Sequence, residues 1–303
     1  MRKFFFQALL ILALCDCRNS AASAVAASAA FTPSPEFSRY WLSGTAELAR
    51  FSLSQARYSE IHNGELVVIT VSEPFRSDKQ VKSELTPGVN EVTVLKVQQM
   101  RRFATGIYDY ALTTTSFKPL DTAMHPLALK VTGSAVDWCG QAWLQLNLKK
   151  GSYAVQGRSY FEESGDEDFA VPGIMSEDEI WQRIRLQPTA LPQGTVQVIP
   201  SLFSSRLRHR KLAAEQANAE LLMYGALKQS EYSLVYALGT ANERRVSFIF
   251  ENNFPHRILE YRETYMDGFE KPKKLTTIAR LKKTVNTAYW REHDNNHRAK
   301  RRA

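Results

Sequence analysis

Cysteine is scarce in this chain of 303 residues, and its placement excludes a disulfide framework. Cys15 and Cys17 lie near the N-terminus, so Cys139 is the one thiol expected in the folded body. A lone cysteine in a compartment that oxidises thiols is most often buried and inert, and we expect this of Cys139.

Long hydrophobic runs are also missing, which excludes a polytopic membrane protein. The longest apolar run extends from Phe4 to Leu14, is interrupted only by Gln7, and has 11 residues. A transmembrane helix needs about 20. Because Arg2 and Lys3 precede this run, it is typical of the apolar region of a signal peptide and indicates export.

Two kinds of processing are compatible with this signal. The segment Leu12 to Cys15 resembles a bacterial lipobox, which predicts lipidation of Cys15, although Leu14 stands where a small residue is usual. The alternative is ordinary signal cleavage near Ala24. We expect a lipoprotein-like signal over residues 1–17 and a flexible tether, rich in Ala, Ser and Pro, over residues 18–36.

The net charge of +8 does not indicate a nucleic-acid partner, because it is confined to one segment. Residues 271–303 carry 11 Lys and Arg and 2 acidic residues, whereas residues 1–270 carry 28 basic and 29 acidic residues. We therefore predict a neutral β-rich domain over residues 37–270 and a basic C-terminal segment and tail over residues 271–303, with no nucleic acid bound.

Motifs for known catalytic or metal chemistry are absent from the sequence. It contains no HExxH, CxxC, GxSxG, Walker or GxGxxG pattern, and its six histidines have no close ligand spacing within a regular element. The acidic run of residues 162–168 lacks the spacing of a calcium loop and is expected to be a solvated hairpin loop. We predict no metal and no cofactor; Cys139 is a weak catalytic candidate, which would need His62 or His125 as its base.

Strand signals dominate the body of the chain. Apolar and polar residues alternate over several short runs, most strictly from Trp143 to Leu148. A first strand region is expected from Tyr40 to Leu53. Asn63-Gly64 between apolar runs predicts a hairpin turn. Short turns between strands favour antiparallel pairing, so the fold class is mainly β (α+β): a barrel, half-barrel or sandwich with about two inserted helices.

The two helices have different signals. Ser176 and Glu179 form a capping box before an apolar face that contains Trp181, and Pro188 ends this helix. A second helix is expected from Pro200 or Ser201 to about residue 216. Its basic side is either a solvated face or a patch for phosphate or lipid head groups, and consists of Arg206, Arg208, Arg210 and Lys211.

Aromatic residues make up 11% of the chain and give two alternatives for the interior. They line a cavity for an apolar ligand, or they fill the core. The candidates for a cavity lining are Trp41, Trp138, Trp143 and Trp181.

Several short segments between residues 40 and 265 resemble a family of exported proteins from Bacteroidota. They are Tyr40-Trp41, Gly44-Thr45-Ala46-Glu47, Gln55-Ala56-Arg57-Tyr58, Val71-Ser72-Glu73-Pro74-Phe75, Thr105-Gly106-Ile107-Tyr108, Trp138-Cys139-Gly140, Ser159-Tyr160-Phe161-Glu162 and Ile199-Pro200-Ser201. Members often carry the label "septum formation inhibitor Maf", but the serine-proline-arginine-arginine loop and aspartate-rich motif of Maf pyrophosphatases do not occur here. The family often has a histidine after Trp-Cys-Gly, where this chain has Gln141. The resemblance implies export and supplies no catalytic residue.

These observations predict an exported envelope protein of the periplasm or outer membrane, attached to the membrane through a lipid on Cys15. The leading hypothesis is a non-enzymatic binding or carrier module for a lipid or other apolar ligand. A structural partner in an envelope complex is the alternative, attached through the basic side or tail. A hydrolase or transferase that uses Cys139 is a second alternative, which requires a concave site where this thiol meets a histidine.

Overall fold

A computed structural model describes residues 30–85 and 88–302. In this part of the chain the strands form one 15-stranded sheet, in which every pair of neighbouring strands is antiparallel. The strands are β1 Ala46–Arg57, β2 Glu60–Arg76, β3 Val81–Lys82, β4 Glu91–Thr105, β5 Tyr108–Pro119, β6 Lys130–Asp137, β7 Gly140–Lys149, β8 Ser152–Ser159, β9 Glu167–Pro172, β10 Gly194–Val198, β11 Glu215–Tyr224, β12 Gln229–Tyr236, β13 Arg244–Glu251, β14 Ile258–Asp267 and β15 Lys273–Thr287. The expected mainly β, antiparallel fold is confirmed.

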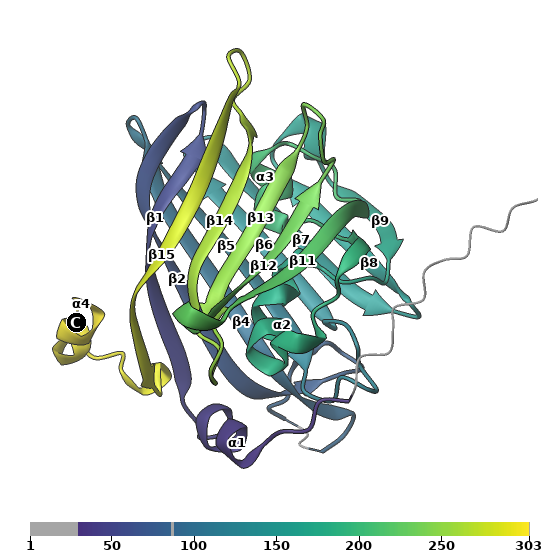
Figure 1. Ribbon diagram of the computed structural model, residues 1–303, viewed down its shortest axis with the longest axis vertical. Coiled ribbons are helices and arrows are strands. Elements are labelled where there is room, and N and C mark those ends of the chain that lie inside the picture. Colours follow the sequence, from purple (N-terminus) through teal and green to yellow (C-terminus); the bar gives the residue numbers. More distant parts are fainter. Residues whose placement is uncertain (1–29, 86–87, 303) are drawn as a thin grey trace, which may run out of the picture.

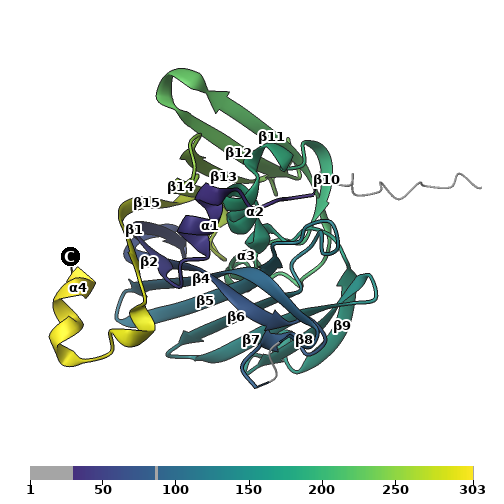
Figure 2. The ribbon, with the colours of Figure 1, turned by 90° about the horizontal axis from the view of Figure 1, so that it is seen from below.

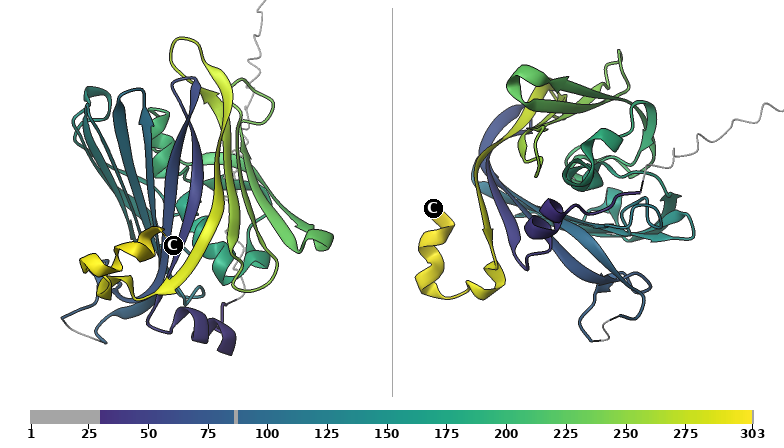
Figure 3. Two further views of the ribbon diagram at one scale, coloured as in Figure 1. Left: turned by 90° about the vertical axis from the view of Figure 1, so that its left-hand side faces the viewer. Right: turned by 60° about the horizontal axis from the view of Figure 1, so that its bottom comes forward.

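The sheet curls into an open half-barrel (Figures 1 and 2). Its order is β10-β11-β12-β13-β14-β15-β1-β2-β4-β5-β6-β7-β8-β9, and β3 pairs with β2 outside this path. The edge strands β9 and β10 do not pair with each other. Just beyond them, one parallel bridge joins Ser176 to Ile199. Two short helices, α2 (Ile180–Leu186) and α3 (Leu202–Leu207), lie inside the curve, as Figure 3 shows.

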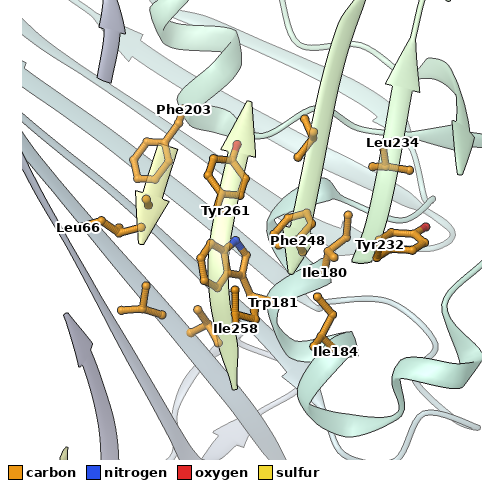
Figure 4. Close-up of a cluster of buried hydrophobic side chains, with 14 of the residues drawn as sticks. Leu66, Ile180, Trp181, Ile184, Phe203, Tyr232, Leu234, Phe248, Ile258 and Tyr261 are labelled. Carbon is orange, nitrogen blue, oxygen red and sulfur yellow. The ribbon is translucent and has the colours of Figure 1, made fainter. Parts of the chain in front are cut away.

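Aromatic packing fills the centre of the half-barrel. Trp181 of α2 lies among rings from three strands of the sheet, with centroids 6.1 Å from Phe51 on β1, 5.5 Å from Phe248 on β13 and 5.9 Å from Tyr261 on β14. Figure 4 shows Trp181 with Phe248 and Tyr261. Offset and edge-to-face ring pairs at these distances add to the stabilisation from burial. The two helices therefore cover the apolar concave face, which an open curved sheet would otherwise expose to water.

The N-terminal part of the body is helical, in contrast to the strand expected from Tyr40. Helix α1 (Pro35–Trp41) begins at Ser34, whose hydroxyl accepts a hydrogen bond from the amide of Phe37. Proline in the first turn suits a helix start. Trp41, the last residue of α1, is buried. Helix α1 lies at the bottom of the half-barrel in Figure 1 and closes that end, so the last residues of the expected tether belong to this helix.

The hairpin turn predicted at Asn63-Gly64 is wrong, because both residues lie inside β2. The turn is made by Tyr58 and Ser59, both with positive φ. A Cβ on Gly64 would lie 2.2 Å from the carbonyl oxygen of Arg102 on β4. Gly64 is therefore needed for the close approach of two strands rather than for a turn.

The predicted helix before Pro188 is confirmed, but its capping box is not reciprocal. Ser176 accepts a hydrogen bond from the amide of Asp178, at the start of the 3₁₀ turn Glu177–Glu179 that leads into α2. The Glu179 carboxylate does not return to Ser176. It contacts the amide of Ala128 and the guanidinium of Arg183 instead.

The second helix is much shorter than predicted. Helix α3 ends at Leu207, and residues 208–214 form an irregular segment before β11. His209 has a φ of 50°, which ends the helical path. The carbonyl of Leu207 accepts a hydrogen bond from the buried guanidinium of Arg57 at 2.5 Å, so a tertiary contact occupies an oxygen that a longer helix would use.

The domain boundary expected at residue 270 falls inside the sheet. Strand β15 begins at Lys273 and pairs with both β14 and β1, near the middle of the strand order. Beyond it, two 3₁₀ turns and α4 (Arg298–Arg302) lie outside the half-barrel. None of the helices in the described ranges is long and apolar enough to cross a bilayer.

Candidate functional site

A groove of about 200 Å³ lies between the concave face of β5–β9 and the segment from α3 to Leu212. Small residues on neighbouring strands create this space: Gly133 and Ala135 on β6, Ala142 on β7 and Gly157 on β8. The strand register places Gly133 opposite Leu144, and Leu144 opposite Gly157, so these positions share one face. The hollow follows from the absence of side-chain volume there.

Apolar side chains surround the floor of small residues. Leu112 lies on one side and Phe169 on the other, and Leu144 lies between them. Leu202 and Phe203 of α3 form the cover, and a Cβ on Gly133 would lie 3.0 Å from Leu202. The groove is thus apolar at its base, and α3 sits as close to the sheet as glycine allows.

Charged side chains surround the mouth of the groove. The last turn of α3 contributes Arg206, and the segment after it contributes Arg210 and Lys211. The β8–β9 loop and the start of β9 contribute Glu163 and Glu167. Lys211 pairs with Glu167 at 3.0 Å. Lys211 is exposed and Glu167 is half-buried, and an ion pair in such a setting contributes only about 0–1 kcal/mol. These charged residues define the mouth of the groove but do not hold it in one fixed arrangement.

His209 adds a titratable group to the mouth. Burial, reinforced by the guanidinium groups of Arg57 and Arg206, lowers the pKa of His209 below its ordinary value. Its ring lies 3.8 Å from the Glu163 carboxylate, a contact that becomes an ion pair only when the ring is protonated. At neutral pH the charge at the mouth therefore comes from the arginines, Lys211 and the two glutamates.

Buried polar contacts hold the cover of the groove in place. The Asp178 carboxylate accepts hydrogen bonds from the Ser201 hydroxyl at 2.8 Å and from the Leu202 amide at 2.9 Å. Next to it along the chain, Glu177 forms a bidentate pair with Arg244, and both distances are 2.7 Å. The start of α3 is thereby fixed to the segment that precedes α2.

The Arg244 guanidinium joins a second strand to this ionic cluster. It also donates to Glu263 on β14 at 2.7 Å, and all three charged groups are buried. Tyr236 and Tyr261 donate their hydroxyls to the two glutamates. Because each carboxylate is paired and hydrogen-bonded, the cluster is compatible with an interior position.

The structure does not bring the four candidate tryptophans together. Trp41 is the last residue of α1 and is buried, whereas Trp181 fills the core and borders a separate space of about 20 Å³. Trp138 is 68% exposed in the β6–β7 turn. Of the four, only Trp143 borders the groove.

Trp143 borders the groove along β7 without directing its ring into it. It pairs in register with Ser134, whereas Gly133, which faces α3, pairs with Leu144. Because successive strand residues point to opposite faces, the indole of Trp143 leaves the sheet on the outer face.

The basic residues predicted after Pro200 do gather at one site. Arg206, Arg210 and Lys211 all border the groove. Arg208 does not, and its guanidinium lies 5.6 Å from the Tyr265 ring. Apart from Arg206 they lie in the irregular segment, so chain bending rather than one helix face brings them together.

Cys139 is exposed, in contrast to the expected buried thiol. It lies in the β6–β7 turn, where the Asp137 carboxylate accepts a hydrogen bond from its amide at 2.7 Å. His125 lies in the β5–β6 connection at the opposite end of β6, and His62 contacts the Arg57 carbonyl. Neither histidine is placed as a base for this thiol. Cys15 lies outside the described residues.

The floor residues Gly133, Ala142 and Gly157 were missed by the sequence reasoning. A glycine inside a strand marks a bulge or a close approach of another group. Both glycines occur within alternating runs, so this signal was present in the sequence. Most of the acidic run lies in the β8–β9 hairpin loop, as expected, whereas its last two residues, Glu167 and Asp168, begin β9. Within the described ranges, no cluster of His, Cys, Asp and Glu has a geometry that could hold a metal.

No family model, curated protein or solved structure matches this chain. Function is therefore inferred from the groove and its surroundings.

Proposed function

We propose that the protein is a non-enzymatic binding or carrier module of the bacterial envelope, exported and attached through a lipid on Cys15, which holds a lipid or another apolar ligand in the groove. The observation that carries the proposal is the apolar groove itself. Its floor consists of small residues on three neighbouring strands, and α3 covers it.

The shape of the groove favours a chain-like ligand. Apolar side chains at the base favour a hydrocarbon chain, because removing apolar surface from water provides most of the binding free energy. The volume of about 200 Å³ accommodates a chain segment rather than a whole phospholipid. The charged mouth gives a polar end group contact with both solvent and protein.

Arg210 gives the polar end a specific partner. It is exposed at the mouth, and no ion pair of this side chain occurs in the described ranges. A guanidinium matches the geometry of a carboxylate or phosphate. The favoured ligand is therefore an amphiphile with a hydrocarbon chain in the groove and an anionic or polar group at the mouth.

Native mass spectrometry of the protein purified from its own membranes tests this proposal. The expected result is a discrete noncovalent adduct that disappears on denaturation. Ala142→Phe, which fills the floor, should remove the adduct. Ala154→Phe on the opposite face of β8 is the matched control and should retain it. A protein without an adduct after incubation with a lipid extract of those membranes would contradict the proposal.

The denatured mass from the same sample tests attachment. Acyl chains on Cys15 are expected, and a mature chain that begins near Val25 would contradict lipidation. The structural-partner alternative would gain from cross-linking in intact cells that joins the protein to one envelope protein, whether or not an adduct is found.

A further inference from the structure

Four neighbouring hairpins at the groove end of the half-barrel each carry a large apolar side chain at the tip. They are β14–β15 with Phe269, β1–β2 with Tyr58, β4–β5 with Ile107 and β6–β7 with Trp138. These hairpins follow one another in the sheet order and turn at the same end, which is at the top of Figure 1. We call these four residues the apolar tips.

The apolar tips are unusual residues for turns. Ile107 is 85% exposed and Phe269 is 64% exposed. Two-residue hairpin turns favour Asn, Asp and Gly, so isoleucine and tryptophan in them are not explained by turn formation. Tyr58 has a φ of 56°, a conformation that costs free energy for a bulky residue. Departures from local rules of this kind are expected at functional surfaces.

Cationic side chains accompany the apolar tips. The His209 ring lies 5.3 Å from the Phe269 ring, which places the segment containing Arg210 beside this tip. Lys271 and Lys273 follow Phe269 in the same hairpin and are exposed, and in the described ranges neither has an ion-pair partner. The next hairpin beyond Trp138, β8–β9, differs, because its exposed Tyr160 precedes the acidic run of residues 162–168.

We propose that the apolar tips dock onto the surface of an anionic phospholipid bilayer. Aromatic side chains are favoured at the boundary between head groups and acyl chains. The Tyr58 and Phe269 rings lie 6.0 Å apart and form one contact pair. Because strands are about 4.8 Å apart, the tips at Ile107 and Trp138 follow at intervals of about 10 Å along the rim. The nearby Lys and Arg side chains match anionic head groups, and each such contact strengthens membrane association.

Docking at this end explains how a ligand reaches the groove. The groove is bordered by the segment after α3 and by the β8–β9 loop, both at the end that carries the apolar tips. A docked protein would hold the groove mouth at the head-group layer, so an amphiphile could pass between bilayer and groove. This part of the inference rests on the proposed function, whereas docking itself does not.

The exposed Cys139 provides a probe next to Trp138. In the full chain with Cys15→Ser and Cys17→Ser, a polarity-sensitive dye on Cys139 should shift its emission to shorter wavelength with phosphatidylglycerol vesicles. Spin-labelled acyl chains should quench it. The matched control carries Cys139→Ser and Met124→Cys, so the dye lies in the β5–β6 connection at the opposite end. An unshifted Cys139 dye, or an equal shift at position 124, would overturn the proposal.

Vesicle sedimentation tests the tips themselves. Ile107→Asn combined with Phe269→Asn should lower the partition coefficient at least tenfold, because two inserting side chains are lost while asparagine suits a turn. Tyr160→Ser should change it less than twofold. Neutral phosphatidylcholine vesicles should bind the unsubstituted tips about tenfold more weakly than phosphatidylglycerol vesicles. Equal binding by the double variant, or to both vesicle types, would overturn the proposal.

One comparison separates docking from ligand binding. Ala142→Phe, which blocks the groove, should dock normally, and the double tip variant should still bind a soluble amphiphile in its groove. Failure of vesicle docking with intact ligand binding would refute this inference alone. Failure of ligand binding with intact docking would refute the proposed function alone.

Discussion

At the residue scale, Arg244 has the largest expected effect on stability. Its guanidinium pairs with both Glu177 and Glu263, and all three side chains are buried. Arg244→Met would leave two buried carboxylates without a cation, so the free energy of unfolding should fall by about 3–5 kcal/mol. Urea denaturation measures this loss.

The control for Arg244 is Arg262→Met, because Arg262 pairs with Glu260 at the surface. Exposed pairs contribute little, so this variant should lose less than about 1 kcal/mol. Equal losses for the two variants would contradict the structural role given to the buried cluster.

Asp178 makes stability depend on pH. Burial raises the pKa of this carboxyl to about 6, despite hydrogen bonds from Leu202 and Ser201 that lower it. An aspartate in the unfolded chain titrates near about 3.9. Between these values the folded state binds a proton that the unfolded state lacks. The stabilisation from this difference is complete below about pH 4 and is lost as the pH rises through about 6.

Asp178→Asn should remove this dependence, because asparagine stays uncharged. From pH 4 to pH 7, the free energy of unfolding of the unsubstituted protein should fall relative to the variant by on the order of 2–3 kcal/mol. Urea denaturation of both proteins at the two pH values measures the difference. Parallel pH profiles would show that Asp178 titrates at its ordinary pKa.

At the element scale, strand contacts explain why a turn signal fails. Asn63-Gly64 has the composition of a hairpin turn, but Gly64 allows β2 to approach β4. Gly64→Ala would place a Cβ 2.2 Å from the Arg102 carbonyl oxygen, so the pairing must shift. We expect a loss of at least about 3 kcal/mol in the free energy of unfolding.

Gly225→Ala is the matched control for Gly64, because its Cβ would have open space around it. This variant should unfold within about 0.5 kcal/mol of the unsubstituted protein. Thermal or urea unfolding compares the two. A neutral Gly64→Ala would mean that β2 and β4 are not in the close register described.

Strand content and antiparallel pairing could be predicted from the sequence, because alternation and short turns are local signals. The end of α2 before Pro188 could be predicted for the same reason, because proline is also a local signal. The end of α3 could not be predicted from local signals, because it depends on Arg57, which is 150 residues away from Leu207. The turn at Tyr58 likewise depends on contacts with Tyr110 and Asp267, on other strands.

Only the charged mouth of the candidate site could be predicted from the sequence; the floor of the groove could not. The gathering of Arg206, Arg210 and Lys211 could be predicted in part, because they lie in one basic segment, but the separate position of Arg208 could not. The floor combines Gly133, Ala142 and Gly157 from three strands, and only the register shows that they share one face. The aromatic content pointed to the tryptophans as the lining of a cavity. The groove is created instead by small residues, whose side chains leave space above the sheet.

At the scale of the whole molecule, the half-barrel separates a filled region from an open one. The aromatic cluster around Trp181 occupies the centre, and the groove lies toward β9, between the sheet and α3. One end is closed by α1 and the other carries the apolar tips. This difference between the two ends is compatible with the two proposals, in which the groove holds an apolar ligand near the end that docks onto the bilayer.

The central claim is that the groove holds an apolar chain, and photoaffinity mapping tests it most directly. The full chain is irradiated with a long-chain fatty acid that carries a diazirine, and the modified peptides are identified by mass spectrometry. Modification is predicted in residues 133–144, 157–169 and 202–212, and Ala142→Phe should abolish it while Ala154→Phe does not. Modification elsewhere on the sheet, or labelling that Ala142→Phe leaves unchanged, would contradict the claim.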